Sequence, residues 1–292
     1  MNRFFAIMLA IIFASITISS ACVAQPSDWI RFTLQAQRGN DQLKASFRQE
    51  RNGRDHNNWS TGLKPSELIG LNVVGFYTAG SRPIAFAVVR EAGRLDCSGN
   101  GGGSYASGNC RFAADPQFTQ LLVSRGIGRL SHDQAFGLMA VDARRELIDS
   151  VAAARYPTPS IDDLTALSAL GVNGRYIADL SGAGYRPQAI HSLIEFKALG
   201  ITPEWIGGLN RIGYANIPSS ELVQLKALNI TPEFIAGFER IGYRHLPVDT
   251  LVQLKALNIT PEFVRSTVGS RATLPPVNEL VDLKIFGSRR SR

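Results

Sequence analysis

Hydrophobic and polar residues alternate along the first part of the chain. From Ile30 to Ala36, and again from Leu43 to Phe47, every second residue is apolar, and polar residues at 38–41 separate the two runs. A period of two is typical of strands that bury one face, so the runs predict a β-hairpin. Further strands are predicted at residues 75–77, 84–90, 95–98 and 109–113, with a short helix at residues 65–71. We therefore expect a small antiparallel sheet of five or six strands.

A helical segment follows the expected sheet. Asp115 is a suitable N-cap, Pro116 fits the first helical position, and Gly126 can end a helix. These residues predict a helix at 116–124. We interpret residues 25–115 as a β domain and residues 116–130 as a linking segment.

The rest of the chain contains an internal repeat. The string Leu-Val-Gln-Leu-Lys-Ala-Leu-Asn-Ile-Thr-Pro-Glu-Phe starts at Leu222 and again at Leu251, which gives a period of 29 residues. Stepping by this period predicts five complete repeats and a sixth that ends after its first helix. Each repeat is expected to be a helical hairpin that buries its apolar residues only against its neighbours. The predicted fold class is α+β: a small antiparallel β domain followed by an α-helical hairpin repeat solenoid at 131–287, with a basic tail at 288–292.

The repeat has columns of similar residues that predict its two helices. In the first helix, apolar residues recur at intervals of three, as at Leu222, Leu225 and Leu228, and form one stripe. The second helix is predicted to start at a threonine N-cap followed by proline and glutamate. The N-caps of the first helices are predicted at Asp133, Asp162, His191, Ser220, Asp249 and Asn278. Thr267, Arg271 and Ala272 depart from the columns of the fifth repeat, as expected of a terminal capping unit.

Two of these columns are candidate partner-binding ladders. The first consists of Lys197, Lys226, Lys255 and Lys284. It could bind an acidic partner, although lysine near a helix C-terminus is also favourable by itself. The second consists of Tyr185, Tyr214 and Tyr243. These tyrosines could form a recognition stripe or pack at the hairpin ends.

The N-terminus has the pattern of a secretory signal peptide. A positive start is followed by an apolar run from Phe4 to Ile18 and then by small residues. The run is shorter than the ~20 residues that span a membrane. Cleavage after Ala24 would remove residues 1–24, and lipidation at Cys22 is the alternative. We expect an exported protein, periplasmic or secreted, that is soluble or anchored by a lipid.

The other two cysteines, Cys97 and Cys110, form a pair in an oxidising compartment, which predicts a disulfide. The glycines at 99–103 lack the Lys-Ser/Thr that follows in a phosphate loop, so they predict a flexible hairpin loop closed by this disulfide.

Candidate catalytic chemistry is sparse in the sequence. The four histidines are His56, His132, His191 and His245. They form no His-Glu-x-x-His motif and no pair with ligand spacing on one helix face. The chain also has no Gly-x-Ser-x-Gly motif. We predict no catalytic, cofactor-binding or metal site.

The composition of the 292-residue chain narrows the partner class. Hydrophobic residues make up 45% and charged residues 19%, which is ordinary for a globular protein. The net charge of +7 is spread out, and no basic run is interleaved with aromatic residues. We therefore expect no nucleic-acid partner, and membrane contact only through a lipid on Cys22.

The amino-acid sequence of the repeats resembles that of repeats in a known family. The Leu-Lys-Ala-Leu-Gly/Asn-Ile-Thr-Pro-Glu-Phe/Trp core and its Gly-Tyr ending are similar to repeats in the periplasmic tails of BlaR/MecR-type regulatory membrane metallopeptidases. Residues 89–93 and the Asp-Pro-x-Phe start at 115–118 also resemble the segment before those repeats. The resemblance extends from about residue 85 to the end. The family's membrane helices and zinc motif are absent here, so protease activity is not implied. What the resemblance implies is an extracytoplasmic sensing or interaction module.

These observations lead to one functional hypothesis and one alternative. We expect a non-enzymatic interaction or sensor module that binds a protein or peptide in the cell envelope. The alternative is a small-ligand-binding protein or a hydrolase with its site in the β domain.

Overall fold

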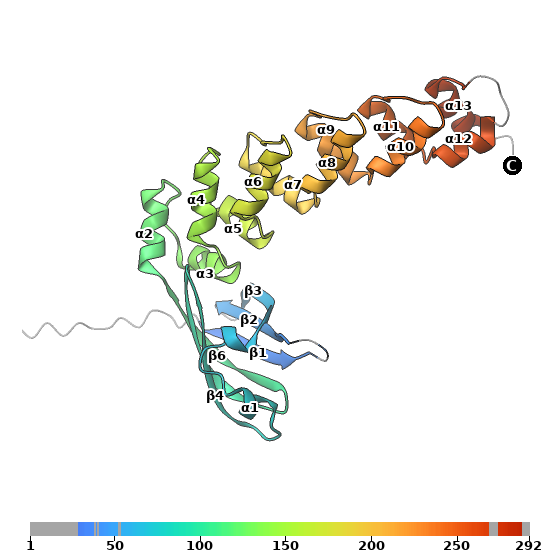
Figure 1. The fold of residues 1–292 in the computed structure, drawn as a ribbon. Coiled ribbons are helices and arrows are strands. Elements are labelled where there is room, and N and C mark those ends of the chain that lie inside the picture. The colour runs from blue at the N-terminus through green and yellow to red at the C-terminus, as the bar shows by residue number, and fades with distance from the viewer. Residues whose placement is uncertain (1–28, 38, 40, 52–53, 269–273, 288–292) are drawn as a thin grey trace, which may run out of the picture.

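The computed structural model describes residues 29–287, apart from residues 38, 40, 52–53 and 269–273, and confirms the α+β architecture (Figure 1). A six-stranded sheet comes first and has the strand order β3-β2-β1-β6-β5-β4, with neighbouring strands antiparallel. Its strands are β1 (Ile30–Ala36), β2 (Leu43–Arg51), β3 (Arg54–Leu63), β4 (Arg82–Arg90), β5 (Gly93–Gly102) and β6 (Tyr105–Ala114). The predicted signal peptide, Cys22 and the basic tail lie outside the described residues.

The alternation of apolar and polar residues gives the sheet one buried face. In β1, Ile30, Phe32 and Leu34 are buried, while the residues between them are exposed. Phe32 packs edge-on against Phe86 of β4, with ring centroids 5.0 Å apart. The hairpin predicted from the period of two is therefore confirmed.

Three local predictions in this region were wrong. Residues 75–77 belong to a helix, α1 (Val73–Tyr77), because the Asn72 side chain caps it by accepting from the Gly75 N–H at 2.9 Å. The predicted helix at 65–71 shortens to the 3-10 turn η1 (Pro65–Glu67), since Ile69 instead forms a bridge with Ala87 of β4. The edge strand β3 was not predicted, because its sequence is too polar to show the alternation.

The glycine-rich segment is mostly strand, which corrects the predicted flexible loop. Only Gly103 and Ser104 form the turn, and both have positive φ, at 61° and 71°. Within the strands, Gly99 faces Gly108 so closely that a Cβ on Gly99 would lie 2.1 Å from the carbonyl oxygen of Ser107. The glycines therefore permit close strand contact. The predicted disulfide is present and joins the register partners Cys97 and Cys110.

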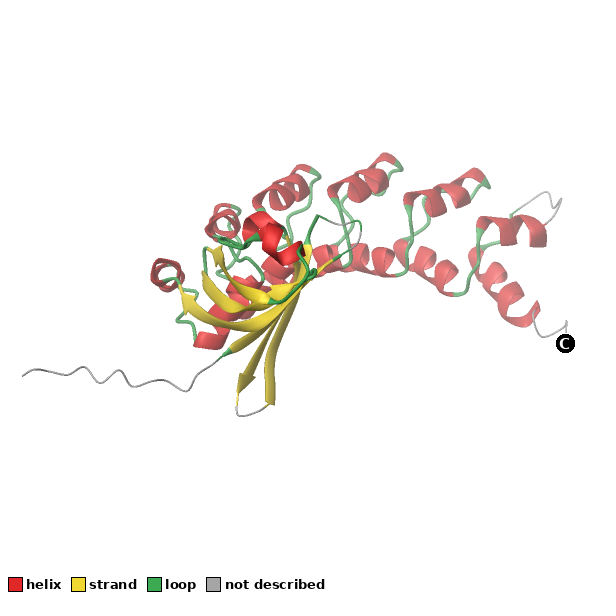
Figure 2. Cartoon of the chain, turned by 90° about the horizontal axis from the view of Figure 1, so that it is seen from below, coloured by secondary structure: helices red, strands yellow, loops and turns green. Residues whose placement is uncertain are grey.

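The helices follow the 29-residue period. The linking helix α2 (Pro116–Ser124) is capped as predicted, since Asp115 accepts from the Phe118 N–H at 2.7 Å. The first helices are α3 (His132–Ala140), α5 (Ile161–Ala169), α7 (Ile190–Ala198), α9 (Ser219–Ala227), α11 (Val248–Ala256) and α13 (Val277–Gly287). The second helices are α4 (Arg145–Ala153), α6 (Gly174–Gly182), α8 (Pro203–Arg211), α10 (Pro232–Arg240) and α12 (Pro261–Val268). The hairpins stack into an extended array that leads away from the sheet (Figures 1 and 2).

The caps of the second helices agree with the repeat columns. Thr202, Thr231 and Thr260 each accept a hydrogen bond from the backbone N–H three residues later, at 3.2 to 3.3 Å. These hydroxyls satisfy one of the free N–H groups at each helix start.

The predicted caps of the first helices were wrong. All six predicted residues, including His191, lie inside the first turn, because the helices start earlier. The observed N-caps lie two residues before the predicted column, at Ser131, Ser160, Ala189, Pro218 and Pro247. Ser131 and Ser160 make reciprocal capping boxes with side chains three residues on. Thr267 lies in α12, and Arg271 and Ala272 lie outside the described residues.

The apolar stripe of the first helices is narrower than predicted. The first two columns, such as Leu222 and Leu225, are buried except at Leu283 in the last helix, but Leu228 is a half-buried C-cap. The additional buried residue is the isoleucine two positions later, as in Ile230, whose N–H donates to the Leu225 carbonyl at 2.8 Å. No helix in the described part of the chain is long and apolar enough to span a bilayer.

Arg90 joins the sheet to the first repeat. Its Nη1 donates to the carbonyl oxygens of Met139 and Ala140, at 2.9 and 2.6 Å, and so caps the end of α3. Its guanidinium lies 4.9 Å from the ring centroid of Trp59 in β3. Arg90 belongs to β4, at the opposite edge of the sheet from β3, so the sheet curves until its two edges meet beside the solenoid.

We predict that Arg90→Met loosens this junction, because methionine keeps much of the stem but leaves two helix-end carbonyls without their donor. The expected loss is about 2–3 kcal/mol in the free energy of unfolding, measured by urea denaturation. Arg94→Met is the matched control, since Arg94 is exposed and, among the described residues, its one ion pair is with Asp96. Equal stability of the two variants would contradict the role assigned to Arg90.

The disulfide gives a second prediction. The cysteines are 13 residues apart, and closing a loop of that size stabilises the folded state by roughly 3 kcal/mol. We expect the double variant Cys97→Ala/Cys110→Ala to lose up to this amount, measured by denaturant melting. A chain of residues 25–292, whose two cysteines are Cys97 and Cys110, should react with a thiol reagent only after reduction. Full labelling without reduction would show that the bond does not form in solution.

Candidate functional site

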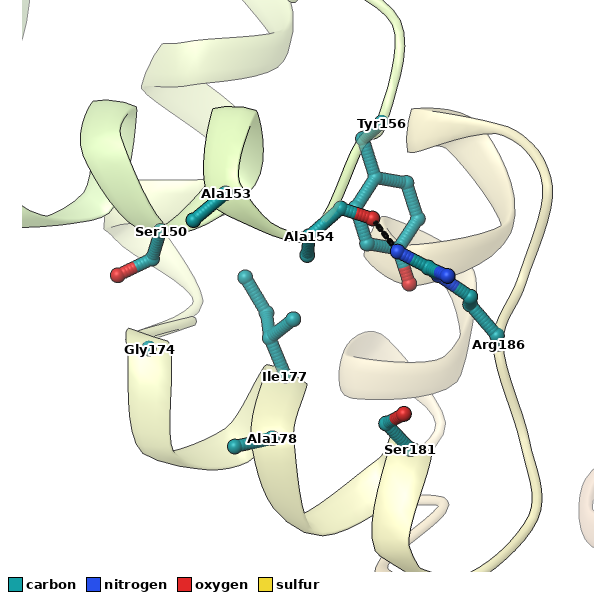
Figure 3. Close-up of a pocket in the computed structure, with 9 residues that line it drawn as sticks. All are labelled: Ser150, Ala153, Ala154, Tyr156, Gly174, Ile177, Ala178, Ser181 and Arg186. Carbon is teal, nitrogen blue, oxygen red and sulfur yellow. Dashed lines mark hydrogen bonds between the residues drawn. The ribbon is translucent and has the colours of Figure 1, made fainter.

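The surface formed by the second helices is hollowed between successive repeats. One cavity of about 330 Å³ lies between α4 and α6 (Figure 3), and another of about 440 Å³ lies between α8 and α10. We call this surface the second-helix groove. Its cavities are at the lower end of the size range for small-molecule sites, so either could hold a short segment of a partner.

The depth of the groove is set by small residues on the second helices. A Cβ on Gly208 would lie 2.9 Å from the Pro232 ring, and a Cβ on Gly237 would lie 2.8 Å from the Pro261 ring. In both pairs, a helix glycine makes room for the first-turn proline of the next repeat. Neighbouring second helices therefore approach closely and leave shallow cavities.

The four lysines of the predicted ladder lie along the seam between repeats. Each ammonium rests over an aromatic ring of the preceding repeat, 4.4 to 5.0 Å from the ring centroid. The pairs are Lys197–Tyr176, Lys226–Trp205, Lys255–Phe234 and Lys284–Phe263. We call this row the lysine seam. Trp205 also lines the cavity between α8 and α10, so the seam borders the groove.

The lysine seam is electrostatically unbalanced. None of the four lysines forms an ion pair with a residue that the structure describes. The cation–π contacts hold each ammonium at the surface. The aromatic partners were not predicted, although a ring stands 21 residues before each of the four lysines.

The three tyrosines of the predicted second ladder contact the next repeat. Their hydroxyls donate to backbone carbonyls 32 residues later: Tyr185 to Ile217 at 2.8 Å, Tyr214 to Leu246 at 2.7 Å and Tyr243 to Pro275 at 2.5 Å. Tyr185 and Tyr214 are only 8% and 6% exposed, which leaves little of them for a partner. This geometry favours packing at the hairpin ends over recognition. We call these bonds the tyrosine latches.

The environments of the repeated groups shift their pKa values. Burial raises the pKa of Tyr176 and Tyr214 to about 12. The exposed Glu204, Glu233 and Glu262 lie in first turns, where hydrogen bonds from backbone N–H groups and threonine hydroxyls lower the pKa of each carboxyl. These carboxylates are therefore stabilised in their charged form at the helix N-termini.

The alternative function would place its site on the open face of the sheet. A wide hollow of about 560 Å³ lies over β4, β5 and β6. Its charged side chains already have partners: Arg94 bonds to Asp96 at 2.8 Å, and the guanidinium of Arg111 lies 4.8 Å from the Trp29 ring centroid.

The structure places the predicted histidines apart. His132 packs edge-on against Phe112, His191 is exposed on α7, and His245 stacks on Tyr214. The side chain of His56 is not among those described. Across the described residues, no three His, Cys, Asp or Glu side chains are grouped so that they could hold a metal ion.

Two buried tyrosines predict a loss of stability at alkaline pH: the latched Tyr214, and Tyr176, whose hydroxyl donates to the Ile201 carbonyl at 2.7 Å. Tyrosines in the unfolded chain ionise near pH 10, whereas Tyr176 and Tyr214 in the fold stay protonated to about pH 12. Their contribution is therefore full below pH 10 and is lost as the pH rises through about 12. Tyr214→Phe should lower stability at neutral pH by about 1–2 kcal/mol and weaken this alkaline loss. Urea denaturation across the pH range measures the stability at neutral pH and its alkaline loss, and Tyr77→Phe, at an exposed tyrosine, is the control. An unchanged urea midpoint for Tyr214→Phe would contradict the role of its hydrogen bond.

Comparisons with protein-family models and with curated proteins give no match to this chain. The function is therefore inferred from the groove, the lysine seam and the residues that hold them in place.

Proposed function

We propose that this protein is a non-enzymatic interaction or sensor module of the cell envelope, and that its second-helix groove binds an acidic protein or peptide. The lysine seam carries this proposal, because it places one unpaired positive charge beside the groove at each of the four junctions from the second repeat to the sixth. The apolar signal-like run at the N-terminus and the disulfide support an oxidising, extracytoplasmic location.

The spacing of the seam fits an extended chain. Packed helices lie about 8–10 Å apart, so successive lysines are separated by roughly that distance. An extended peptide rises about 3.3 Å per residue. A partner with an acidic residue at every third position could therefore pair with successive lysines.

The resemblance of the repeats to those of BlaR/MecR-type regulators supports the same proposal, since in that family they accompany extracytoplasmic sensing. Attachment through a lipid on Cys22 would keep the groove near a membrane surface. Neither the peptidase motif nor its chemistry is needed for binding.

The alternative function is a small-ligand or hydrolase site on the open face of the β domain. The hollow there is larger than the cavities of the groove. Its charged groups, however, already have partners, since Arg94 bonds to Asp96 and Arg111 lies over the Trp29 ring. The lysines of the seam are not paired with any described carboxylate. The seam is therefore the stronger candidate.

Removing the charges of the seam tests the proposal. The triple variant Lys197→Met/Lys226→Met/Lys255→Met keeps much of the apolar stem over each ring but removes the ammonium groups. We expect the mature protein to bind a fluorescent peptide with glutamate at every third position, with an affinity that falls as salt rises. The triple variant should bind about tenfold or more weakly. Fluorescence anisotropy measures both affinities.

Two controls separate charge at the seam from charge in general. Lys44→Met removes an exposed lysine from β2 and should leave binding unchanged. The same peptide with glutamine in place of glutamate should bind poorly. Unchanged binding by the triple variant would contradict the proposal.

A further inference from the structure

The cavity between α4 and α6 lies where the repeat pattern breaks. Tyr156 stands 29 residues before Tyr185 and belongs to the same column as the latched tyrosines. Within the described part of the chain, the Tyr156 hydroxyl makes no hydrogen bond. It lines the cavity instead (Figure 3).

A proline accounts for the missing latch. The acceptors for Tyr185 and Tyr214 follow Asn216 and His245, which have φ angles of +58° and +51°. The equivalent residue in the loop facing Tyr156 is Pro187, whose ring fixes φ near −65°. This loop therefore cannot adopt the backbone conformation that Asn216 and His245 have before the acceptors of Tyr185 and Tyr214, and Tyr156 forms no latch there.

The same loop brings a single positive charge to the cavity. Arg186 donates from Nη2 to the carbonyl oxygen of Ala154 (Figure 3). Arg186 and Tyr156 both line the cavity and interact electrostatically. Arg186 makes no ion pair with the described residues, and the cavity lining contains no carboxylate. An arginine has five N–H donors, so the bond to Ala154 leaves donors for a ligand.

The other walls of the cavity are small and apolar. Ile177 lies at the centre, and Ala153, Ala154 and Ala178 surround it (Figure 3). The Ser181 hydroxyl adds one more polar group to the lining. The cavity thus combines one positive charge, hydroxyl groups and a compact apolar wall. These features suit a ligand that has a single negative charge next to a small side chain.

We infer that this cavity captures the C-terminal carboxylate of a bound peptide, with Arg186 and Tyr156 as hydrogen-bond donors and the alanine wall against a small last side chain. The inference rests on the proposed function, because it places the end of the partner chain in the second-helix groove. A guanidinium matches a carboxylate through two parallel hydrogen bonds. Phosphate fits less well, since it carries about two charges and the lining supplies one.

The test uses the mature full chain and a fluorescein-labelled hexapeptide of glycine and serine that ends in two alanines with a free carboxylate. The same peptide with a C-terminal amide is the matched probe. We expect the amide to bind about tenfold or more weakly than the acid.

Arg186→Gln should remove this difference, and Tyr156→Phe should reduce it. Ala178→Leu, on an exposed helix position, should weaken acid binding by filling the cavity while leaving Arg186 in place.

The outcomes separate this inference from the proposed function. The inference would be overturned if the acid and the amide peptide bound equally, or if Arg186→Gln or Ala178→Leu bound the acid peptide as tightly as the unmodified protein does. It would also be overturned if inorganic phosphate displaced the peptide at lower concentrations than acetate does. The lysine triple variant should still distinguish acid from amide, because the probe carries no glutamate. If glutamate binding depends on the seam but acid and amide bind equally, the proposed function stands and this inference fails. Circular dichroism melts verify that each variant is folded.

Discussion

Helices of nine residues are too short to be stable alone in water, and each hairpin of this array has only two of them. Its apolar stripe is buried only when another hairpin packs beside it. The tyrosine latches and the lysine seam both connect one repeat to the next. They therefore add polar and cation–π contacts to the interfaces at which the apolar residues of neighbouring repeats pack together. At the start of the array the sheet takes the place of a preceding repeat, and Arg90 caps the end of α3.

This dependence on neighbours determines which side chains remain for recognition. The leucines, isoleucines and latched tyrosines are committed to packing, and the threonines and prolines to helix starts. The ammonium groups of the seam and the small-walled cavities of the second helices remain at the surface. Where Pro187 prevents a latch, the hydroxyl of Tyr156 and the guanidinium of Arg186 also become available. In our proposals, the lysine seam supplies a charged track along the later repeats, and the cavity beside Tyr156 supplies a separate site for the end of the partner chain.

The 29-residue period predicted the solenoid, its threonine caps and the lysine column, because each position is repeated several times and chance similarities average out. The alternation in β1 and β2 predicted the first hairpin, and the paired cysteines predicted the disulfide. Short polar segments were predicted poorly: β3 lacks an apolar face in its sequence, and α1 depends on one hydrogen bond from Asn72. The cation–π pairs and the cavity beside Tyr156 depend on contacts between residues 21 to 32 positions apart. Such contacts become visible only once the hairpins are stacked.

Site-specific photocrosslinking in living cells tests most directly whether the second-helix groove is the binding surface. A photoreactive amino acid would be placed at Ala178 or Ala236, which line the groove, and at Gln224 or Gln253, which are exposed on first helices. The account predicts that the two groove positions crosslink to the same partner and that the first-helix positions do not. Crosslinks only from the first-helix positions, or from a probe at Ser98 on the open face of the sheet, would contradict it.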